Sequence, residues 1–272
     1  MKSFTHKNIR VEFESTGGIE SCYILPDFKV AFDTGKCPDA LIDIPVVFLS
    51  HGHLDHASGI SYYFSQRSLR KLNPGTIYVP KSVQKPLSKI TRLWQDIEEF
   101  DYKCDVAGIE VGDKIEIKKD LHVMSVRANH RVSAFGYVIL KTTKKLKKQY
   151  LHLSGRQIAR LKEHEDIFEI VEIPIFAYSG DSTIEIIREN ELMRNAAVLF
   201  MECTYIDEKR NVERARKWGH THLDEIISEA NLFKNEKVVL VHLSRRYSPR
   251  YMQSVLNRRL TEEQKKRFVY VD

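Results

Sequence analysis

The segment at residues 50–59, SHGHLDHASG, places three histidines and one aspartate within six positions. Imidazole nitrogens bind zinc and similar divalent metals, and a carboxylate adds a hard oxygen ligand with negative charge. His51 and His53 are two residues apart, so in extended backbone their side chains point the same way and can converge on one ion. Asp55 and His56 follow where the chain turns, and they can reach a second ion beside the first. The segment therefore predicts a metal site.

Two ions held about 3.5–4 Å apart can share a water, lower its pKa and clamp the attacking and leaving oxygens of a displacement. One loop supplies too few ligands for two ions, and further candidates follow other apolar segments. His130 comes after LHVMSVRA, Asp181 after IPIFAYSG, and His242 directly after KVVLV. Loops at strand ends are where sheet proteins commonly build sites. We therefore expect four strand ends to deliver ligands to one sheet edge.

The segments that position these ligands alternate between strand-like and helix-like patterns. Short segments rich in Val, Ile, Phe and Tyr are typical of strands, and segments with helical spacing of apolar residues lie between some of them. This pattern predicts an α/β layered fold, and residues 1–272 read as a single domain because no linker interrupts them. We predict strands that include 9–13, 29–32, 46–49, 77–79, 114–117, 122–126, 135–140, 173–177, 197–201, 238–241 and 268–271, and helices over 58–71, 82–100, 155–162, 183–193, 223–233 and 248–260.

Composition sets the class of protein. The 272 residues are 42% hydrophobic and 29% charged, which excludes a collagen-like or mostly disordered chain. The net charge of +6 leans mildly toward a polyanionic partner. No apolar run approaches the ~20 residues of a membrane span, and the N-terminal residues lack a signal-peptide pattern. The cysteines form no CxxC pair, which is typical of a reducing compartment, so we expect a cytoplasmic protein without a membrane partner.

One segment, Lys141–Lys148, has five lysines in eight residues. Composition favours a solvated hairpin tip. A functional interpretation is an arm that contacts phosphates by charge. We interpret Trp94 and Trp218 as packing residues.

HGHLDH resembles the HxHxDH signature of the metallo-β-lactamase fold. Further segments resemble, in this order, the motifs of the ribonuclease Z family, whose members trim the 3′ trailer from precursor tRNA. The resemblance covers nearly the whole chain and implies a four-layer αβ/βα sandwich. The segments are NHRVSAFGYVI (129–139), YSGDS (178–182), MECTY (201–205), GHTH (219–222) and HLSRRYS (242–248).

The resemblance also implies roles for the site residues. A hydroxide that bridges two divalent ions, zinc or alternatively manganese or iron, would attack a phosphodiester in line. His220, supported by Glu202, would assist proton transfer to the leaving oxygen, and Asp55 would help to position or deprotonate the water. The implied ligands are His51, His53 and His130 for the first ion, Asp55, His56 and His242 for the second, and Asp181 as the bridge.

Substrate contacts are less sharply defined by the resemblance. Arg246 and Tyr247 would contact substrate phosphate or brace their loop, and His222 would either act in the site or start a helix. Many bacterial members grip the tRNA with a Gly-Pro-rich arm, which this chain lacks, and its Lys-rich segment resembles the short, plant-type form. The implied partners are precursor tRNA and a second copy of the chain, and the lysines that would contact phosphates are Lys144, Lys145, Lys147 and Lys148.

Three other functions are compatible with the same metal core. A phosphodiesterase for a small substrate such as a cyclic nucleotide would need the same ligands, because a fold does not fix its substrate. A thiolester or lactam hydrolase fits the later motifs poorly. A basic RNA-binding protein with a vestigial site would bind well under two ions per chain. Preference for structured RNA over a small diester separates the first alternative from ribonuclease Z activity.

Overall fold

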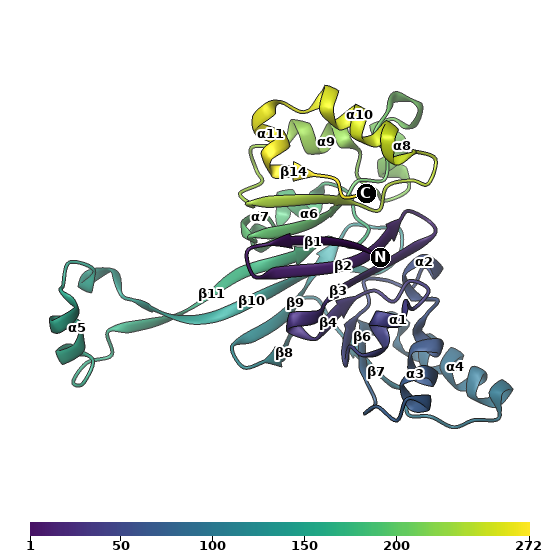
Figure 1. Cartoon of the computed structure of the whole chain (residues 1–272), viewed down its shortest axis with the longest axis horizontal. Coiled ribbons are helices and arrows are strands. Elements are labelled where there is room, and N and C mark those ends of the chain that lie inside the picture. Colours follow the sequence, from purple (N-terminus) through teal and green to yellow (C-terminus); the bar gives the residue numbers. More distant parts are fainter.

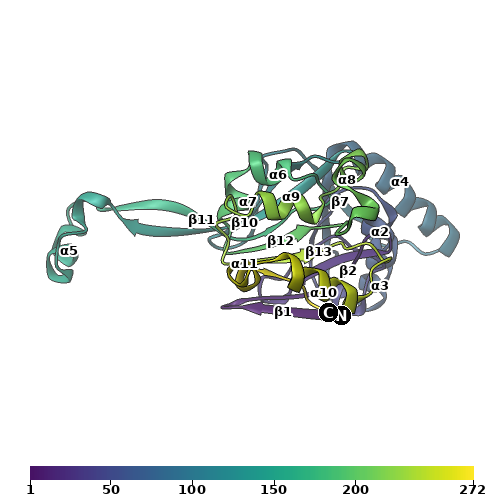
Figure 2. The same ribbon diagram turned by 90° about the horizontal axis from the view of Figure 1, so that it is seen from above.

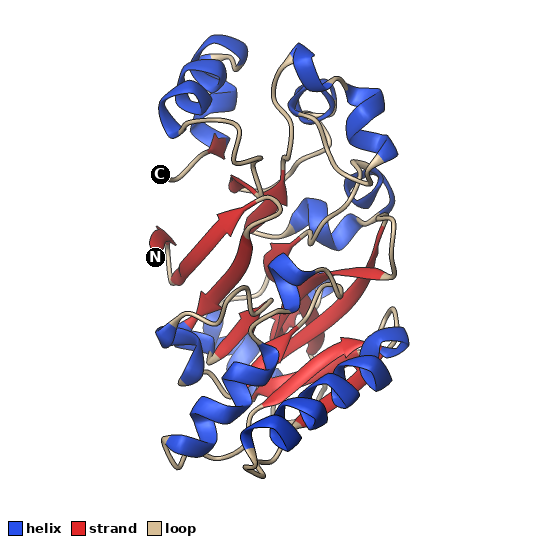
Figure 3. Cartoon of the chain, turned by 90° about the vertical axis from the view of Figure 1, so that its right-hand side faces the viewer, coloured by secondary structure: helices blue, strands red, loops and turns tan.

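The computed structural model describes residues 1–272 and contains two seven-stranded sheets packed face to face, with helices on the outer faces (Figures 1 and 3). This arrangement confirms the predicted four-layer αβ/βα sandwich. The first sheet has the order β1 (Lys2–His6), β2 (Ile9–Thr16), β3 (Glu20–Leu25), β4 (Val30–Phe32), β5 (Val46–Phe48), β6 (Thr76–Pro80) and β7 (Asp105–Ile109). The second has the order β14 (Phe268–Val269), β13 (Lys237–Val241), β12 (Val198–Glu202), β11 (Phe168–Tyr178), β10 (Ala134–Leu146), β9 (Leu121–Ala128) and β8 (Lys114–Lys118).

Both sheets are mixed. Strands β1 to β4 pair antiparallel and β4 to β7 parallel. In the second sheet β8 to β11 pair antiparallel and β11 to β14 parallel. Parallel neighbours send their carboxyl ends to the same edge, which is why the loops after β5, β11 and β13 can meet there.

Apolar side chains from the helices cover each sheet. Helices α1 (Asp39–Ile42), α3 (Ile60–Leu69) and α4 (Lys81–Glu98) pack on the first sheet, and α6 (Glu185–Glu189), α7 (Glu191–Asn195), α9 (Leu223–Ser228) and α10 (Pro249–Arg259) on the second. The remaining helices are α2 (Leu54–Ala57), α5 (Gly155–Leu161), α8 (Val212–Lys217) and α11 (Glu262–Arg267). No helix is both long enough and apolar enough to cross a bilayer.

The central strands are mostly apolar because both of their faces are buried. In β12, Val198 and Phe200 belong to the core between the sheets, whereas Leu199 and Met201 belong to the core under the helices. This alternation follows from the two-residue period of a strand. Aromatic rings fill much of the space between the sheets, and the rings of Phe13 and Phe200, from opposite sheets, meet edge to face at 5.3 Å.

Strands β10 and β11 continue past the body as a two-stranded arm, with α5 at its far end (Figures 1 and 2). The strands leave the body near a register shift between Ile139 and Leu140, where Pro174 faces Leu140. Residues of β10 are buried up to Leu140 and exposed or half-buried beyond it. The hairpin-tip interpretation of Lys141–Lys148 is therefore wrong, because most of this segment is paired strand along the shaft of the arm.

Several local predictions are also corrected. The structure adds strands β1, β3 and β7 to the predicted set. The helix predicted over 183–193 is instead two short helices, because Asn190 adopts an extended conformation and caps α7 with its side chain. Trp94 and Trp218 are 48% and 41% exposed, so the prediction that they are packing residues is wrong.

Candidate metal centre

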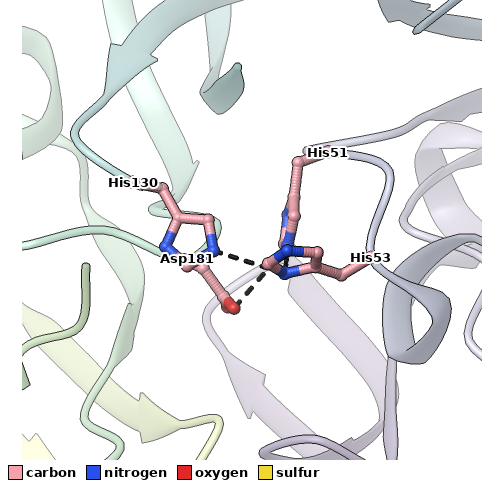
Figure 4. A group of neighbouring side chains, drawn as sticks. All are labelled: His51, His53, His130 and Asp181. Carbon is pink, nitrogen blue, oxygen red and sulfur yellow. Dashed lines mark hydrogen bonds and ion pairs between the residues drawn. The ribbon is translucent and has the colours of Figure 1, made fainter. Parts of the chain in front are cut away.

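Four strand ends meet at one edge of the sandwich, as the sequence predicts. His51 follows β5, His130 follows β9, Asp181 follows β11 and His242 follows β13. Figure 4 shows His51 and His53 on one side of the site and His130 and Asp181 on the other, with their ligand atoms directed at one another. The chain thus brings the seven predicted ligands, together with His220, into overlapping groups: His51, His53, His130 and Asp181; Asp55, His56 and His242; and Asp181, His220 and His242.

The first group is rich in nitrogen. His53 Nδ1 lies 2.9 Å from His51 Nε2 and 3.3 Å from His130 Nε2. Burial lowers the pKa of all three imidazoles, so they carry unprotonated nitrogens at neutral pH. Asp181 Oδ2 lies 3.8 Å from His51 Nε2 and adds the oxygen ligand. Three neutral imidazoles and one carboxylate fit a zinc-type ion.

The second group surrounds the other oxygen of the same carboxylate. Asp181 Oδ1 lies 3.4 Å from Nε2 of His56 and 3.4 Å from Nε2 of His242. Asp55 Oδ2 lies 3.4 Å from His242 Nε2 and 3.6 Å from His56 Nε2. The two oxygens of Asp181 therefore face two different sets of ligands, which is the geometry that a bridging carboxylate requires.

Two polar atoms at the centre of the site lack partners. His56 Nε2 and Asp181 Oδ1 are buried, and neither has a hydrogen-bond partner in the structure. A buried polar atom without a partner is costly, and such atoms in native proteins have a specific explanation. A cation between them would satisfy both atoms, so the residues present fit a metal ion.

A second layer of residues orients the ligands. Asp33 is fully buried; its Oδ2 lies 2.7 Å from His56 Nδ1 and accepts a hydrogen bond from Tyr178 Oη at 2.6 Å. Asp33 also accepts hydrogen bonds from the backbone N–H and the hydroxyl of Ser50. Burial disfavours the charged form of His56, but the negative charges of Asp181 and Asp33 outweigh the effect of burial and raise the pKa of His56. With Nδ1–H donated to Asp33, His56 presents Nε2 to the site.

Sequence reasoning missed Asp33. It directly follows the buried strand β4, VAF, so it carries the same strand-end signal as the predicted ligands. His130 and His242 are oriented in a comparable way. His130 Nδ1–H donates to the backbone carbonyl of Gly219 at 2.8 Å, and His242 Nδ1 lies 3.0 Å from Thr204 Oγ1.

Glu202 and His220 form a pair beside the ligands. Glu202 is fully buried and accepts hydrogen bonds from the backbone N–H groups of Thr204 and Thr221 at 2.9 and 3.0 Å. Its Oε1 lies 2.9 Å from His220 Nδ1. Burial opposes the charged form of His220, but the carboxylates of Glu202 and Asp181 outweigh it and raise the pKa of His220 to about 9. His220 thus holds its proton near neutral pH.

The other predicted site residues lie outside this cluster. His222 caps α9 by accepting from the backbone N–H of Asp224 at 3.0 Å, which corresponds to the helix-start interpretation. Tyr247 Oη donates to Asp207 at 3.2 Å, and Arg246 is exposed on the same loop. On the arm, Lys147 pairs with Asp166 at 3.3 Å. The other three lysines that were predicted to contact phosphates are exposed and have no ion pair: Lys144, Lys145 and Lys148.

The fold and the histidine–aspartate cluster define a metal-dependent hydrolase of the metallo-β-lactamase fold. The family model for the beta-lactamase superfamily domain matches residues 26–243. Two solved structures share the fold. YhfI from Bacillus subtilis has a TM-score of 0.64 at 15% identity, covering 94% of this chain and 92% of that one. The short form of human tRNase Z has a TM-score of 0.62 at 18% identity, covering 87% and 93%.

Two curated plant relatives narrow this class. The chain is 35% identical to tRNase Z TRZ1 of Arabidopsis thaliana over 91% of this chain and 89% of the relative. It is also 35% identical to the chloroplastic tRNase Z TRZ2 of the same plant, over 87% of this chain and 68% of the relative. The chain belongs to the tRNase Z, or ribonuclease Z, family, as the motif resemblance predicts.

Proposed function

We propose that this chain is an endoribonuclease that removes the 3′ trailer from precursor tRNA, and that residues 1–272 act as one hydrolase domain. The observation that carries the proposal is the position of Asp181. Its two oxygens face two groups of imidazoles beside the Glu202–His220 pair. Family membership supplies the substrate class, since the curated relatives are named tRNase Z.

We propose that the site holds two divalent ions. When bound, the ions would lower the pKa of a shared water and offset charge on the phosphodiester. The nitrogen-rich ligand set favours zinc, with manganese or iron as alternatives. The first ion would be held by His51, His53, His130 and Asp181, and the second by Asp55, His56, His242 and Asp181.

His220 is suited to deliver a proton to the leaving oxygen. Its Nδ1 faces Glu202, which leaves Nε2 as the nitrogen available to a substrate. Its raised pKa keeps it in the acid form near neutral pH, and a protonated histidine can act as a general acid. Glu202 contacts neither substrate nor water in this scheme; it holds the imidazole in place and stabilises its charge.

Asp55 is better suited to binding and positioning than to proton abstraction. Burial raises the pKa of its carboxyl, but hydrogen bonding and charge from His242, with His56, outweigh burial and lower the pKa to about 2. A carboxylate with such a low pKa is a weak base near pH 7. Asp55 also accepts a hydrogen bond from the backbone N–H of Gly18 at 2.9 Å, which fixes its orientation.

The arm supplies a charged surface for RNA. Lys144, Lys145 and Lys148 are exposed along it and have no ion pair, so their charges are available to phosphates. Contacts of this kind give affinity that falls with salt and carries little sequence information. We propose that the arm holds the body of the tRNA, whereas Arg246 and Tyr247 lie on the loop after His242 and brace or contact the substrate near the cut.

We propose that the enzyme is a homodimer. Helix α4 exposes Ile90, Leu93, Trp94 and Ile97, which we call the α4 stripe, and these residues recur at helical spacing on one face. An exposed apolar stripe of this kind is typical of a protein interface. Helix α4 lies on the side of the body away from the arm (Figure 1), so a partner bound to this helix leaves the arm free for RNA. All four cysteines are free, which suits the reducing cytoplasm that we propose as the compartment.

The test is cleavage of a precursor tRNA that carries a 3′ trailer, in zinc or manganese, beside an Asp55→Ala control. A single cut after the discriminator base, lost in the control, supports the proposal. Hydrolysis of bis-p-nitrophenyl phosphate without cleavage of the precursor would contradict the substrate and favour a phosphodiesterase for a smaller molecule. A metal assay with well under two ions per chain would contradict the dinuclear site.

A further inference from the structure

We propose that Trp218 and Arg131 form a platform at the rim of the metal centre on which one unpaired nucleotide of the RNA substrate stacks, next to the scissile phosphate. The inference rests on the proposed function, because it assigns a substrate contact to an RNA-cleaving site. The catalytic groups themselves recognise only phosphate. The platform adds a site beside them that positions a base.

The platform is attached to the catalytic residues on both of its sides. Trp218 directly follows helix α8, Gly219 comes next in the left-handed conformation with φ of 74°, and His220 follows Gly219. Arg131 follows His130, whose Nδ1–H donates to the carbonyl of Gly219 at 2.8 Å. The platform residues are therefore chain neighbours of the proposed proton donor and of a proposed metal ligand.

The loop that carries Trp218 and the loop that carries Arg131 are in close contact at Gly219. A Cβ atom at this position would lie 2.8 Å from His130 Nδ1 and 3.0 Å from the backbone nitrogen of Arg131. Only glycine allows both the left-handed φ and this close approach. The distance between the platform and the metal centre is thus fixed by backbone packing, as positioning a base relative to a cut requires.

The chemistry of the pair suits a nucleobase. The guanidinium carbon of Arg131 lies 4.5 Å from the centre of the Trp218 ring, within the range of a cation–π contact. The tryptophan is nevertheless 41% exposed, and Arg131 is also exposed. Aromatic rings and the planar guanidinium group are the surfaces on which unpaired RNA bases stack.

A hollow beside Arg131 offers room and charge for the same nucleotide. It has a volume of about 640 Å³, and its lining includes Arg127, Arg131 and Arg216 but no acidic residue. Arg216 is paired with Glu225, whereas Arg127 and Arg131 have no ion pair. Arginine side chains without a carboxylate partner in a concave site are suited to bind phosphate.

One residue that lines the hollow carries a polar atom without a partner. Asn129 Oδ1 is buried, lacks a hydrogen bond, and belongs to a residue that lines the hollow next to His130. An amide side chain can accept from or donate to the edge of a base. Trp218 itself lines a second hollow, together with Lys209, Arg214 and Lys217 and two glutamates. Basic side chains thus lie near the exposed ring, and aromatic rings beside basic side chains are typical of single-strand binding.

These features favour an unpaired nucleotide over a duplex. In a duplex, neighbouring base pairs stack and cover one another's faces, so only an unstacked base can lie on a side chain. The competing explanation is that Arg131 and Trp218 merely hold the two loops together. That explanation predicts equal effects of substitution on all substrates, whereas a platform affects only substrates that carry a base beside the cut.

The first experiment measures stacking directly. The chain has two tryptophans, so Trp94→Phe leaves Trp218 as the sole tryptophan and Trp218→Phe leaves only Trp94 on α4. Metal-free protein is titrated with a short oligoadenylate while binding is followed by anisotropy of a labelled oligomer. We expect fluorescence to be quenched in the Trp94→Phe protein and not in the Trp218→Phe protein. Absence of binding, or binding without quenching of Trp218, would overturn the platform.

The second experiment measures the contribution to cleavage. Trp218→Leu should raise KM for precursor tRNA by about 10-fold or more, the value expected for one stacked base. The rise in KM for precursor tRNA should exceed the rise for bis-p-nitrophenyl phosphate, which has no base. Trp218→Phe keeps an aromatic ring and should bring KM for precursor tRNA most of the way back to the wild-type value. Removal of the base from the flanking nucleotide should raise the KM of the wild-type enzyme for precursor tRNA. The same change should raise the KM of Trp218→Leu only slightly further. Additive effects, or equal losses on both substrates, would overturn the proposal.

The two experiments separate this inference from the proposed function. If the wild-type protein hydrolyses the small diester but leaves precursor tRNA intact, the tRNA proposal fails and the fluorescence titration still decides whether Trp218 stacks on RNA bases. If precursor tRNA is cleaved but Trp218 variants behave as the wild type, the function stands and the platform is rejected.

Discussion

Nδ1 of His220 lies 2.9 Å from Oε1 of Glu202, a carboxylate with no exposed surface. Because Glu202 also accepts hydrogen bonds from the backbone N–H groups of Thr204 and Thr221, its position does not depend on His220. The carboxylate is thus a fixed negative charge that holds the imidazole in one orientation and stabilises its protonated form.

Glu202→Gln should shift the pH dependence of cleavage. Glu202 raises the pKa of His220 against the effect of burial, so removal of the charge lowers that pKa. The acid form of His220 is lost as pH rises through its pKa, and the alkaline limb of the kcat/KM profile should therefore move to lower pH. Both proteins are measured at saturating metal. Glu208→Gln, an exposed carboxylate of the neighbouring loop, is the control, and an unmoved limb in Glu202→Gln would contradict the pairing.

Asp181→Ala should abolish cleavage and reduce the number of ions bound per chain. The substitution removes the only side chain whose two oxygens face both groups of imidazoles. Metal content by elemental analysis and activity on precursor tRNA are measured together. Asp96→Ala, which removes an exposed carboxylate on α4, should leave both unchanged. Turnover in Asp181→Ala near that of the wild type would contradict the assignment of Asp181 as a bridging ligand.

Asp33→Asn should weaken metal binding although Asp33 itself is not among the proposed ligands. It contacts His56 at 2.7 Å and fixes which ring nitrogen faces the site. Loss of such an outer partner typically costs about 10- to 100-fold in metal affinity. Competition with a chelator measures the affinity, and thermal unfolding checks that the protein remains folded. Tyr178→Phe removes one hydrogen bond to Asp33 and should have a smaller effect; wild-type affinity in Asp33→Asn would refute the role.

Replacing Lys144, Lys145 and Lys148 together by Gln should weaken RNA binding and flatten its dependence on salt. The slope of log K against log salt should decrease by up to about 0.9 for each lysine that neutralises a phosphate. Lys147 is left in place because it pairs with Asp166 within the arm. Lys85→Gln, Lys89→Gln and Lys103→Gln together remove three exposed charges outside the arm and are the control for total charge. A slope equal to that of the wild type would show that the arm lysines are only solvated.

Leu93→Glu with Ile97→Glu should dissociate the proposed homodimer. Both side chains are more than half exposed on the α4 stripe, at 51% and 69%, and a buried charge without a partner is costly at an interface. Sedimentation velocity measures the change of mass. Ser88→Glu adds a charge at an exposed position of the same helix outside the stripe and should leave the dimer intact. A monomeric wild-type protein, or a double variant that stays dimeric, would contradict this interface.

Errors in the predicted elements have definite physical causes. Helix α4 shows helical spacing of apolar residues, but its buried positions include Thr91 and Gln95 whereas Ile97 is 69% exposed. Periodicity identifies a helix without revealing which face its neighbours will cover. Lys141–Lys148 is rich in charge and is nevertheless mostly strand, because β10 continues to pair with β11 beyond the body.

The sequence by itself determined the ligand types, their positions after apolar strands and the layered fold, since these depend on residue chemistry and on the two-residue period of strands. It also supplied the signal for Asp33, although this signal was overlooked. Only the tertiary structure decided that Asp181 faces two groups of ligands, that His222 caps a helix, and that Trp218 lies beside Arg131. These relations join residues from separate loops, and their distances depend on how two sheets and their connections pack, which local sequence does not specify.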